Sequence, residues 1–406
     1  MRLTHLIATA LLCCAAAHAA DEEAAPYAQR PDVEQLTALG RAMFSDRSLS
    51  AGGKVACASC HDPRHAYGPP PGRAMTPGAV RTVPSLRYLQ TLLPFSEHYF
   101  DTDGDDSIDA GPTGGQTWDG RVDSAHEQAR LPLLSPREMG NHQPEQVVRK
   151  LARSAYAAQF RRSFGDDVFT DVTRAFDAAL LALEVFQQSP ADFFPYSSRY
   201  DAVLRGQATL SPQEARGLAL FNDADKGNCA ACHRSEPTSD GAFPLFTDFG
   251  HIALGLPRNR GIAANADPGF YDLGLCGPLR TDLRDHPEYC GRFRAPSLRN
   301  VALRDRFFHN GAARTLSDAL RFYVERDTRP ERWYKTGRNK ARQNDKEMKY
   351  NDLPAAYHDN VNTEPPFGGQ PGDTPRLDER DIRDIVAFLK TLTDADQLPA
   401  QKQGAR

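Results

Sequence analysis

The sequence lacks a segment that is apolar for long enough to cross a membrane. The apolar run from Leu6 to Ala17 falls short of the roughly 20 residues that a membrane-spanning helix needs. It follows Met1-Arg2 and precedes Ala17-His18-Ala19 and an acidic segment, which is the layout of a cleavable secretory signal. We therefore expect residues 1–20 to be removed on export and the mature protein to be soluble.

The chain also lacks an excess of basic residues and shows little strand-like alternation. Its formal net charge is −4, so it has no basic surface of the kind that binds nucleic acid. Because alternating apolar and polar residues are scarce, we expect a mainly α fold. At 406 residues the chain is long enough for two domains, each with its own core.

Cysteine is infrequent: the chain has eight, and Cys13 and Cys14 lie inside the predicted signal. Four others form two copies of one motif, Cys57-Ala58-Ser59-Cys60-His61 and Cys229-Ala230-Ala231-Cys232-His233. Covalent attachment of a c-type haem requires this pattern, because the two thiols form thioethers with the porphyrin vinyl groups and the histidine ligates the iron. We therefore predict two covalently bound haems, with His61 and His233 as proximal ligands.

The two remaining cysteines, Cys276 and Cys290, lie in a stretch that contains glycine and proline. In an exported protein a disulfide between them is favoured over two free thiols. Thioether-linked haem and a disulfide both indicate an oxidising compartment. In a bacterium this compartment is the periplasm.

Two parts of the chain resemble each other around the haem motifs. Gly40-Arg41-Ala42-Met43-Phe44 precedes the first motif and Gly217-Leu218-Ala219-Leu220-Phe221 precedes the second, with apolar residues at helical spacing in front of both. We interpret this as a duplicated unit of a helix ending in phenylalanine, a short polar loop and a haem-binding sequence. It predicts an N-terminal cytochrome c domain over residues 21–205 and a C-terminal one over residues 206–406.

Other elements can be placed from local signals. Helices are expected over Val168–Phe186 and Leu377–Leu392, and Ser211-Pro212 marks the start of the helix before the second haem motif. Stretches rich in glycine and proline, such as Tyr67–Pro84 and Glu364–Thr374, are expected to be loops. The predicted fold is mainly α, with two cytochrome c-like domains, each built around one haem, and long loops.

Two further groups of motifs accompany the haem sequences. The first comprises Trp118-Asp119-Gly120-Arg121, Glu127-Gln128-Ala129, Pro132 and Pro136-Arg137-Glu138-Met139. The second comprises Arg294-Ala295-Pro296-Ser297-Leu298-Arg299-Asn300, Phe308-His309-Asn310-Gly311 and Thr315-Leu316. With these motifs the chain resembles the bacterial dihaem cytochrome c peroxidase superfamily, including its MauG branch, over nearly all of the mature sequence.

The resemblance implies a set of residues that act on peroxide. Glu138 would move a proton between the peroxide oxygens, Gln128 would hold peroxide or water by hydrogen bonding, and Pro132 would shape the pocket. Trp118 matches the tryptophan that lies between the two haems and would carry electrons between the irons. The alternatives are a surface carboxylate for Glu138 and a core tryptophan for Trp118.

The resemblance also distinguishes the two haems. Some relatives close the first haem with a histidine from the following loop, but Tyr67–Val83 contains none, so we expect an open first haem, with Met75 as the alternative ligand. At the second haem, Tyr323 stands where cytochrome c peroxidases have an axial methionine and MauG has a tyrosine. A phenolate ligand favours the higher oxidation states of iron, whereas methionine favours reduction. The alternatives are a core aromatic residue at Tyr323 and ligation by Met348.

Calcium is a candidate cofactor at two places. Carboxylates alternate around a glycine over Asp101–Asp109, as in a calcium loop, although the downstream glutamate is missing and a solvated acidic turn is the alternative. The family also binds calcium between its domains. At that site Arg87 replaces the family's asparagine and Arg304-Asp305-Arg306 replaces its Thr-x-Pro, which weakens the expectation of calcium there.

The sequence thus predicts a periplasmic dihaem oxidoreductase of the MauG-like kind. Hydrogen peroxide would react at the first haem, and its oxidising equivalents would be shared with the second. The reductant would be a protein substrate, oxidised at an aromatic side chain, or another electron donor. The alternatives are a conventional cytochrome c peroxidase supplied by a small cytochrome and, without enzymatic activity, a dihaem electron-transfer protein.

Overall fold

The computed structural model describes residues 31–100, 109–334 and 349–399. The predicted signal peptide, most of the acidic segment at 101–109 and Met348 lie outside the described residues. The structure is mostly helical, as predicted, with one two-stranded antiparallel sheet formed by β1 (His251–Ala253) and β2 (Arg292–Arg294), in which His251 pairs with Arg294. No described helix is both long and apolar enough to span a membrane.

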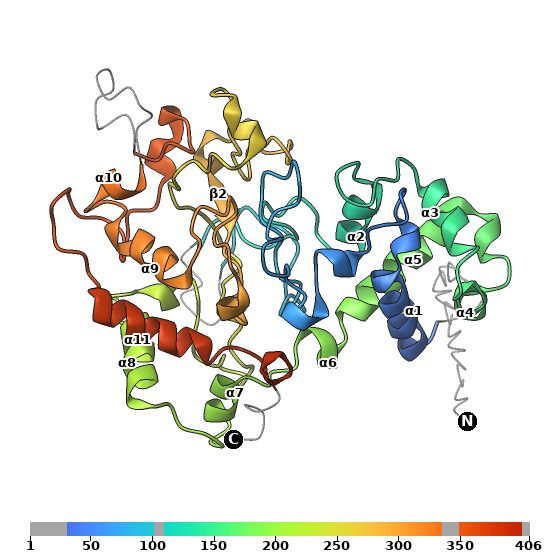
Figure 1. The fold of residues 1–406 in the computed structure, drawn as a ribbon, viewed down its shortest axis with the longest axis horizontal. Helices are drawn as coiled ribbons and strands as arrows, with labels where there is room; N and C mark the ends of the chain where they lie inside the picture. The colour runs from blue at the N-terminus through green and yellow to red at the C-terminus, as the bar shows by residue number, and fades with distance from the viewer. Residues whose placement is uncertain (1–30, 101–108, 335–348, 400–406) are drawn as a thin grey trace, which may run out of the picture.

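The first half of the chain forms an N-terminal bundle of helices, at the right of Figure 1. Asp32 caps the start of the first helix, because its side chain accepts a hydrogen bond from the Glu34 N–H group at 2.8 Å. Apolar side chains on the inner faces, such as Leu39, Phe160 and Phe186, form one core. The bundle consists of α1 (Val33–Ser45), α2 (Ala125–Leu134), α3 (Pro144–Leu151), α4 (Ala157–Phe164) and α5 (Val172–Gln187).

The helix predicted over Val168–Phe186 is interrupted. Residues Val168–Thr170 form a separate 3-10 turn, and α5 begins only at Val172. Asp171 causes the break, because it adopts extended backbone angles and its carboxylate caps the Arg174 N–H group at 3.0 Å. The apolar pattern identified the helical region, and the capping residue sets its start.

The second half of the chain forms a C-terminal body around a second core that includes Phe221, Phe246 and Phe388. Ser211 caps α8 in a capping box with Glu214, and Pro212 is its first residue, as predicted. The predicted helix Leu377–Leu392 is α11 (Glu379–Lys390), shortened because the Asp378 carboxylate caps its start. The remaining helices are α6 (Pro190–Phe193), α7 (Arg199–Leu204), α8 (Pro212–Asn222), α9 (Leu316–Glu325) and α10 (Pro330–Trp333).

Short 3-10 turns connect these helices. They are η1 (Arg47–Leu49), η2 (Cys57–Ser59), η3 (Pro63–His65), η4 (Val168–Thr170), η5 (Cys229–Ala231), η6 (Ala263–Ala266), η7 (Pro287–Tyr289), η8 (Val301–Leu303), η10 (Ala355–Asn360) and η11 (Ala395–Gln397). Tyr200 of α7 packs in the C-terminal core. The division of the chain between residues 205 and 206 stays a prediction.

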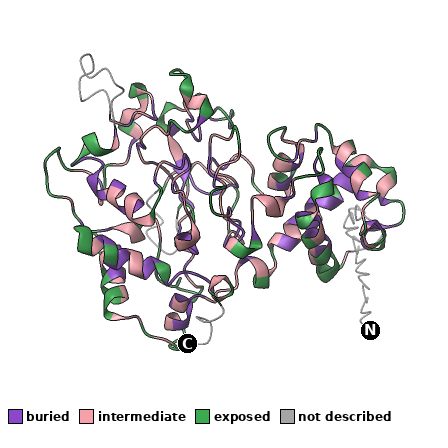
Figure 2. Cartoon of the chain, in the orientation of Figure 1, coloured by how far each residue is buried: buried purple, intermediate pink, exposed green. Residues whose placement is uncertain are grey.

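Long loops from the first half, residues 66–100 and 109–122, lie against the C-terminal body in the centre of Figure 1. Figure 2 shows buried positions on the inner helix faces and along these central loops. Their position is fixed by contacts such as the ion pair of Arg81 with Asp272, at 2.7 Å. The predicted disulfide between Cys276 and Cys290 is confirmed, and it closes a loop beside β2.

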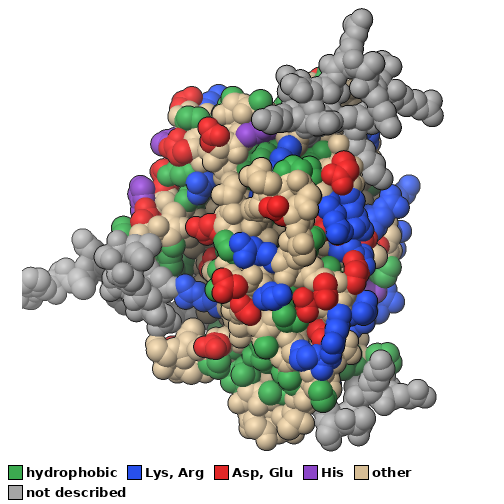
Figure 3. Space-filling view, turned by 90° about the vertical axis from the view of Figure 1, so that its left-hand side faces the viewer, with side chains coloured by type: hydrophobic (Ala, Val, Ile, Leu, Met, Phe, Trp, Pro, Cys, Tyr) green, Lys and Arg blue, Asp and Glu red, His purple; other side chains and the backbone are tan. Residues whose placement is uncertain are grey.

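Acidic and basic side chains are interspersed on the face that carries α8, α9 and α11 (Figure 3). Ion pairs connect these helices: Arg321 on α9 contacts Glu379 on α11 at 2.7 Å, and Arg216 on α8 contacts Asp384 on α11 at 2.8 Å. Because these pairs are partly exposed, each adds little stability, and the apolar core beneath them holds the helices together.

The predicted duplication appears as one repeated helix contact. A Cβ atom on Gly40 of α1 would lie 2.0 Å from the Ala182 carbonyl oxygen of α5. A Cβ atom on Gly217 of α8 would lie 2.0 Å from the Asp384 carbonyl oxygen of α11. Both glycines therefore allow two helix backbones to touch, and each helix ends one residue after the phenylalanine that precedes a haem motif.

Substitution of Gly217 by alanine is expected to destabilise the protein by about 3 kcal/mol, the upper end of the cost of overpacking, because the new methyl group meets backbone that cannot rotate away. Urea unfolding of the purified protein would measure this loss. Gly52→Ala is the control, since no atom lies within 4 Å of its Cβ position. Equal stability of the two variants would contradict the close helix contact.

Candidate functional site

The first haem motif folds into a tight turn that directs its histidine inward. Residues Cys57–Ser59 form η2, and the His61 N–H group donates to the Cys57 carbonyl at 2.9 Å. The His61 Nδ1 atom lies 3.1 Å from the carbonyl oxygen of Tyr67. A carbonyl oxygen can only accept, so Nδ1 carries the proton and the Nε2 lone pair is left for a metal. Burial lowers the pKa of His61 to about 4, which keeps the ring neutral near pH 7.

The second motif repeats this geometry. The His233 N–H group donates to the Cys229 carbonyl at 2.8 Å, and Nδ1 lies 2.8 Å from the Phe246 carbonyl oxygen. The two acceptor residues share an unusual backbone, because Tyr67 (φ 53°) and Phe246 (φ 57°) are both left-handed.

Buried aromatic packing holds the two acceptor residues in this conformation. The Tyr67 ring lies 5.6 Å from that of Phe44, and the Phe246 ring lies 6.2 Å from that of Phe221. Phe44 and Phe221 are the next-to-last residues of the duplicated helices. The repeated unit therefore includes the acceptor of the histidine hydrogen bond, which the sequence comparison of the two halves did not reveal.

The donor set at both motifs fits a covalently attached haem. The four cysteines of the motifs are free thiols, and each motif has one imidazole with an available Nε2 atom. Around the second motif the walls of a cavity are mainly apolar, as a porphyrin requires. Its lining includes Cys229, Cys232, His233, Leu320, Tyr323, Val324 and Phe367.

Tyr323 lies on the α9 face that lines this cavity, together with Leu320 and Val324, one turn or less away on the helix. Its ring stacks on Phe367 with centroids 5.1 Å apart. Among the described residues no hydrogen bond to its hydroxyl group is present. Burial raises the pKa of Tyr323, and so do the nearby thiols of Cys232 and Cys229. The structure thus brings Tyr323 into the same cavity as His233.

Gln128 and Pro132 lie one turn apart on α2, which ends at Leu134. The following turn brings Glu138 back toward the helix, because the Met139 N–H group donates to the Pro132 carbonyl at 3.1 Å. The Met139 carbonyl in turn accepts from the Ala51 N–H group at 2.7 Å, in the loop before the first haem motif. The residues predicted to act on peroxide are thereby attached to that loop.

Burial raises the pKa of the Cys57 and Cys60 thiols, and the charge of Glu138 adds to both shifts, which places Glu138 near the first motif. The Glu138 side chain is exposed at the surface, but the protein atoms on one side of it desolvate the carboxyl group and raise its pKa. The positive charge of Arg121 acts in the opposite direction. A carboxyl group whose pKa is raised can exchange a proton nearer neutral pH.

Trp118 lines the cavity of the second motif and is fixed at both ends. Its indole N–H group donates to the Thr82 carbonyl at 2.8 Å, and its own carbonyl accepts from the Arg294 N–H group at 2.9 Å. The ring of His309 lies edge-on to it, with centroids 6.5 Å apart. Trp118 is thus held between the central loops and the C-terminal body.

A buried ion network supports Trp118, and sequence reasoning missed it. Arg81 contacts Asp119, the neighbour of Trp118, and Asp272, each at 2.7 Å. Although burial opposes ionisation of Asp119, Arg81 and then Arg121 lower its pKa to about 2. Arg81 and Asp272 are 191 residues apart, so no local sequence signal could have paired them.

The alternative iron ligands are two methionines, Met75 and Met348. The Met75 sulfur lies beside Gly311 of the C-terminal body, 3.3 Å from the position of a Cβ atom on that residue. Met348 lies outside the described residues. The open first haem, with Met75 as the alternative ligand, and the choice of Tyr323 over Met348 at the second haem both stay predictions.

The residues at the predicted interdomain calcium position do not fit a metal ion. The Arg87 guanidinium contacts Asp394 and Asp396, and the Arg304 guanidinium donates to the Val83 carbonyl at 2.9 Å. Cations therefore stand where cation ligands would be needed. Within residues 31–100, 109–334 and 349–399, no group of three or more His, Cys, Asp or Glu side chains could hold a metal.

The chain is similar to known proteins over most of its length. Residues 34–209 match the family model of the di-haem cytochrome c peroxidases. The methylamine utilization protein MauG of Paracoccus denitrificans (strain Pd 1222) is 33% identical over 378 residues, which covers 90% of each chain. The cytochrome c551 peroxidase of Pseudomonas aeruginosa is 28% identical over 297 residues, 72% of each chain. The crystal structure of the diheme peroxidase BthA from Burkholderia thailandensis E264 has a TM-score of 0.79 at 38% identity, covering 92% of this chain and 90% of that one.

Substitution of Arg81 by methionine is expected to destabilise the protein by about 3–5 kcal/mol, because it leaves Asp272 buried without its cation and Asp119 with Arg121 alone. Chemical unfolding followed by circular dichroism would measure the change. Arg64→Met is the matched control: Arg64 also contacts an aspartate, Asp62 at 2.9 Å, but its side chain is 85% exposed and its loss should change little. Similar losses in both variants would show that burial does not govern these ion pairs.

Proposed function

This chain belongs to the di-haem cytochrome c peroxidase family, and we propose that it is a MauG-like oxidase within that family. Peroxide reacts at the site of His61, and the oxidising equivalents are shared with the site of His233 and Tyr323. The reductant is a side chain of a partner protein or another electron donor. The observation that carries this proposal is the position of Tyr323 in the cavity lined by His233.

The identity of the ligand opposite His233 decides between a MauG-like oxidase and a conventional peroxidase. A phenolate oxygen carries charge and stabilises oxidised iron, whereas a methionine thioether raises the reduction potential and suits acceptance of single electrons. Tyr323 is partly buried, its ring is fixed by stacking on Phe367, and no hydrogen bond joins its hydroxyl group to another described residue. Since the side chain lines the cavity together with His233, its oxygen is available to coordinate an iron atom held there.

When bound, the haem at the first motif supplies an iron atom that reacts with peroxide. The chain positions that reaction: His61 offers Nε2 because its Nδ1–H group donates to Tyr67. Glu138 accepts the proton from one peroxide oxygen and returns it to the other, which its raised pKa allows. Gln128 orients the peroxide by hydrogen bonding, and Pro132, one turn further along α2, shapes the wall of the pocket.

Trp118 connects the two sites. Its indole lines the cavity of the second motif, and its hydrogen bond to Thr82 fixes the orientation of the ring. An aromatic ring that is held rigidly between two redox sites provides an intermediate step for electron transfer between them. Arg81 contributes by fixing the backbone next to Trp118 through Asp119.

The alternative function is a conventional cytochrome c peroxidase, and the similarity to the cytochrome c551 peroxidase of Pseudomonas aeruginosa supports it. That function needs a methionine at the second site, where Tyr323 lies. A dihaem electron carrier without enzymatic activity would need protein ligands on both faces of both haems, and the loop 67–83 offers no histidine for the first. The disulfide of Cys276 and Cys290 and the N-terminal signal sequence support a location in the periplasm.

Substitution of Glu138 by glutamine is expected to slow the reaction with peroxide by about 10²–10⁴-fold, the usual contribution of a general acid–base group. In the wild type the rate should rise with pH, because only the ionised carboxylate accepts a proton. Burial raises the pKa of Glu138, so this rise should lie above the range of an ordinary glutamate. Stopped-flow absorption of the diferric protein across pH would measure both effects.

The control for this experiment is Glu127→Gln. Glu127 is exposed on α2, the helix that carries Gln128 and Pro132, so its loss should leave both the rate and the pH profile unchanged. The role of Glu138 is refuted if its glutamine variant keeps the wild-type rate and pH profile while its haem spectrum is intact.

Substitution of Tyr323 by phenylalanine is expected to change the absorption and EPR spectra of the second haem and to leave those of the first unchanged. The phenylalanine ring can still stack on Phe367 at the cavity wall, so only the oxygen is lost. Tyr323→Met should raise the rate of ferrocytochrome c oxidation by peroxide, because it creates the ligand set of a conventional peroxidase. Spectra of the resting protein and a steady-state cytochrome assay would test these outcomes. Rapid ferrocytochrome c oxidation by the wild type, with no spectral change in Tyr323→Phe, would favour the conventional peroxidase instead.

A further inference from the structure

Arg304 places a guanidinium group at the junction of the two halves of the chain. It directly follows η8, and its Nη2 atom donates to the Val83 carbonyl at 2.9 Å. Its Nε atom donates to the Arg306 carbonyl at 3.3 Å. Val83 belongs to the loop after the first haem motif, whereas Arg306 belongs to the C-terminal body. One cation therefore binds carbonyl oxygens from both halves, and such oxygens are also the ligands that hard metal ions prefer.

The charge of Arg304 has no carboxylate partner at ion-pair distance within the described part of the chain. The negative charge of Asp305 acts on the Arg304 guanidinium and raises its pKa, against the larger effect of burial. The Asp305 carboxylate itself accepts a hydrogen bond from the Gly72 N–H group at 2.6 Å. Burial lowers the pKa of Arg304 to about 10, so the guanidinium stays charged near pH 7. This charge lies close to the first haem site, because the Arg304 Nη1 atom lies 3.8 Å from the position of a Cβ atom on Gly68, the residue after the Tyr67 that accepts the His61 hydrogen bond.

The same cation helps to position Trp118. Val83 follows Thr82, whose carbonyl accepts the indole N–H group of Trp118 at 2.8 Å. Thr82 is also held by the C-terminal body, because its N–H group donates to the His309 carbonyl at 2.6 Å. Both Arg304 and Trp118 line the cavity of the second haem motif. The segment Thr82–Val83 thus joins the guanidinium, the indole and the two halves of the chain.

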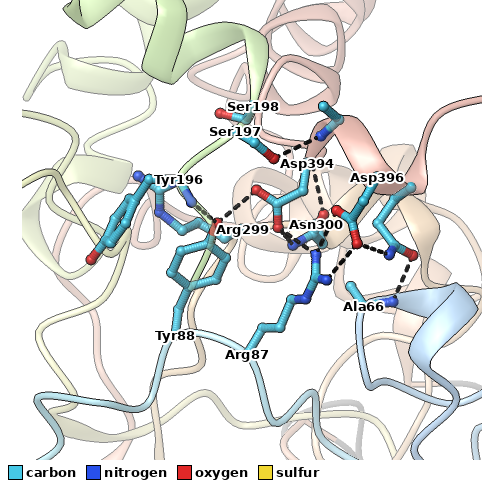
Figure 4. A network of polar contacts seen from close by, with 12 residues as sticks. Ala66, Arg87, Tyr88, Tyr196, Ser197, Ser198, Arg299, Asn300, Asp394 and Asp396 are labelled. Carbon is cyan, nitrogen blue, oxygen red and sulfur yellow. Dashed lines mark hydrogen bonds and ion pairs between the residues drawn. The ribbon is translucent and has the colours of Figure 1, made fainter. Parts of the chain in front are cut away.

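Arg87, the other arginine at the expected calcium position, differs because its charge is neutralised. Its Nη1 atom lies 2.8 Å from Asp394 Oδ2 and its Nη2 atom lies 2.6 Å from Asp396 Oδ2 (Figure 4). The Tyr88 hydroxyl group also donates to Asp394, at 2.6 Å. These contacts connect the loop after the first haem motif to the segment that follows α11. Both arginines line the cavity, and of the two only Arg304 has no carboxylate at ion-pair distance among the described residues.

We propose that Arg304 is a built-in cation that takes the place of a bound divalent metal ion at the junction of the two haem sites. It bridges the two halves through carbonyl oxygens, and its positive charge raises the reduction midpoint of the haem held by His61. The junction consequently needs no calcium. This inference depends on the two haems of the family and holds for either kind of peroxidase.

The first test uses the wild-type holoprotein. Spectroelectrochemical titration gives the reduction midpoints of both haems, and thermal unfolding gives the stability, each measured after treatment with EGTA and again after addition of CaCl₂. We expect the same midpoints and the same unfolding temperature in both conditions. Because the segment 101–109 could bind calcium independently, the Asp103→Asn/Asp105→Asn variant is measured in parallel.

The second test removes the charge. Arg304→Met should shift the midpoint of the first haem downward, since a nearby positive charge favours the reduced iron. Arg304→Lys should retain most of the wild-type value, and it keeps the test valid if the methionine variant does not fold. Arg306→Met is the matched control, because it removes a cation two residues away whose Nη1 atom donates only to the Asp305 carbonyl, at 2.7 Å.

The outcomes separate the possibilities. The proposal is supported if the midpoints are insensitive to EGTA and fall in Arg304→Met but not in Arg306→Met. A calcium effect that disappears in the Asp103→Asn/Asp105→Asn variant belongs to the segment 101–109 and also supports it. The proposal is overturned if EGTA lowers the midpoint in that variant as well and CaCl₂ restores it, or if the two methionine variants shift the midpoint equally.

Discussion

The hydrogen bond from each proximal histidine to a backbone carbonyl is the interaction on which the rest of the structure depends. It fixes the tautomer of His61 and His233, and so leaves the atom that binds iron available. Each acceptor carbonyl belongs to an aromatic residue with left-handed backbone angles, a conformation that costs free energy. Burial of the Tyr67 and Phe246 rings against the duplicated helices offsets this cost. The two helix pairs therefore act as supports for two imidazole rings.

Sequence reasoning predicted the features that depend on residues close together in the chain. The haem motifs, the cap at Ser211 and the helix that contains Phe221 are local features. The disulfide could also be predicted, because the loop between Cys276 and Cys290 is short. The start of α5 was misplaced because the apolar pattern continues across Asp171 while the backbone does not. The carbonyl acceptors escaped notice because their spacing from the histidine differs, six residues for Tyr67 and thirteen for Phe246.

The support for the candidate site could not be predicted for a different reason. Arg81 with Asp272 and Arg87 with Asp394 are pairs of residues 191 and 307 positions apart, and common residue types such as these give no signal of pairing in a single sequence. Their burial explains why they matter. A buried guanidinium requires compensation, so each pair specifies how the loops of the first half dock on the C-terminal body. The ion pairs contribute less to stability than to the position in which the loops dock on the C-terminal body.

The two haem sites need opposite surroundings, and the chain provides them with different elements. At the first site a carboxyl group of raised pKa lies on a turn between α2 and α3, accessible to solvent and able to exchange protons. At the second, α9 presents Tyr323 to the cavity, and its hydroxyl group makes no hydrogen bond within the described part of the chain. In the proposed mechanism, electrons pass between the sites at the junction Thr82–Val83, where the indole of Trp118 and the guanidinium of Arg304 bind adjacent carbonyl groups. The proposed relay and the cation proposed to raise the potential are therefore coupled in position, because neither can shift without moving the backbone that holds the other.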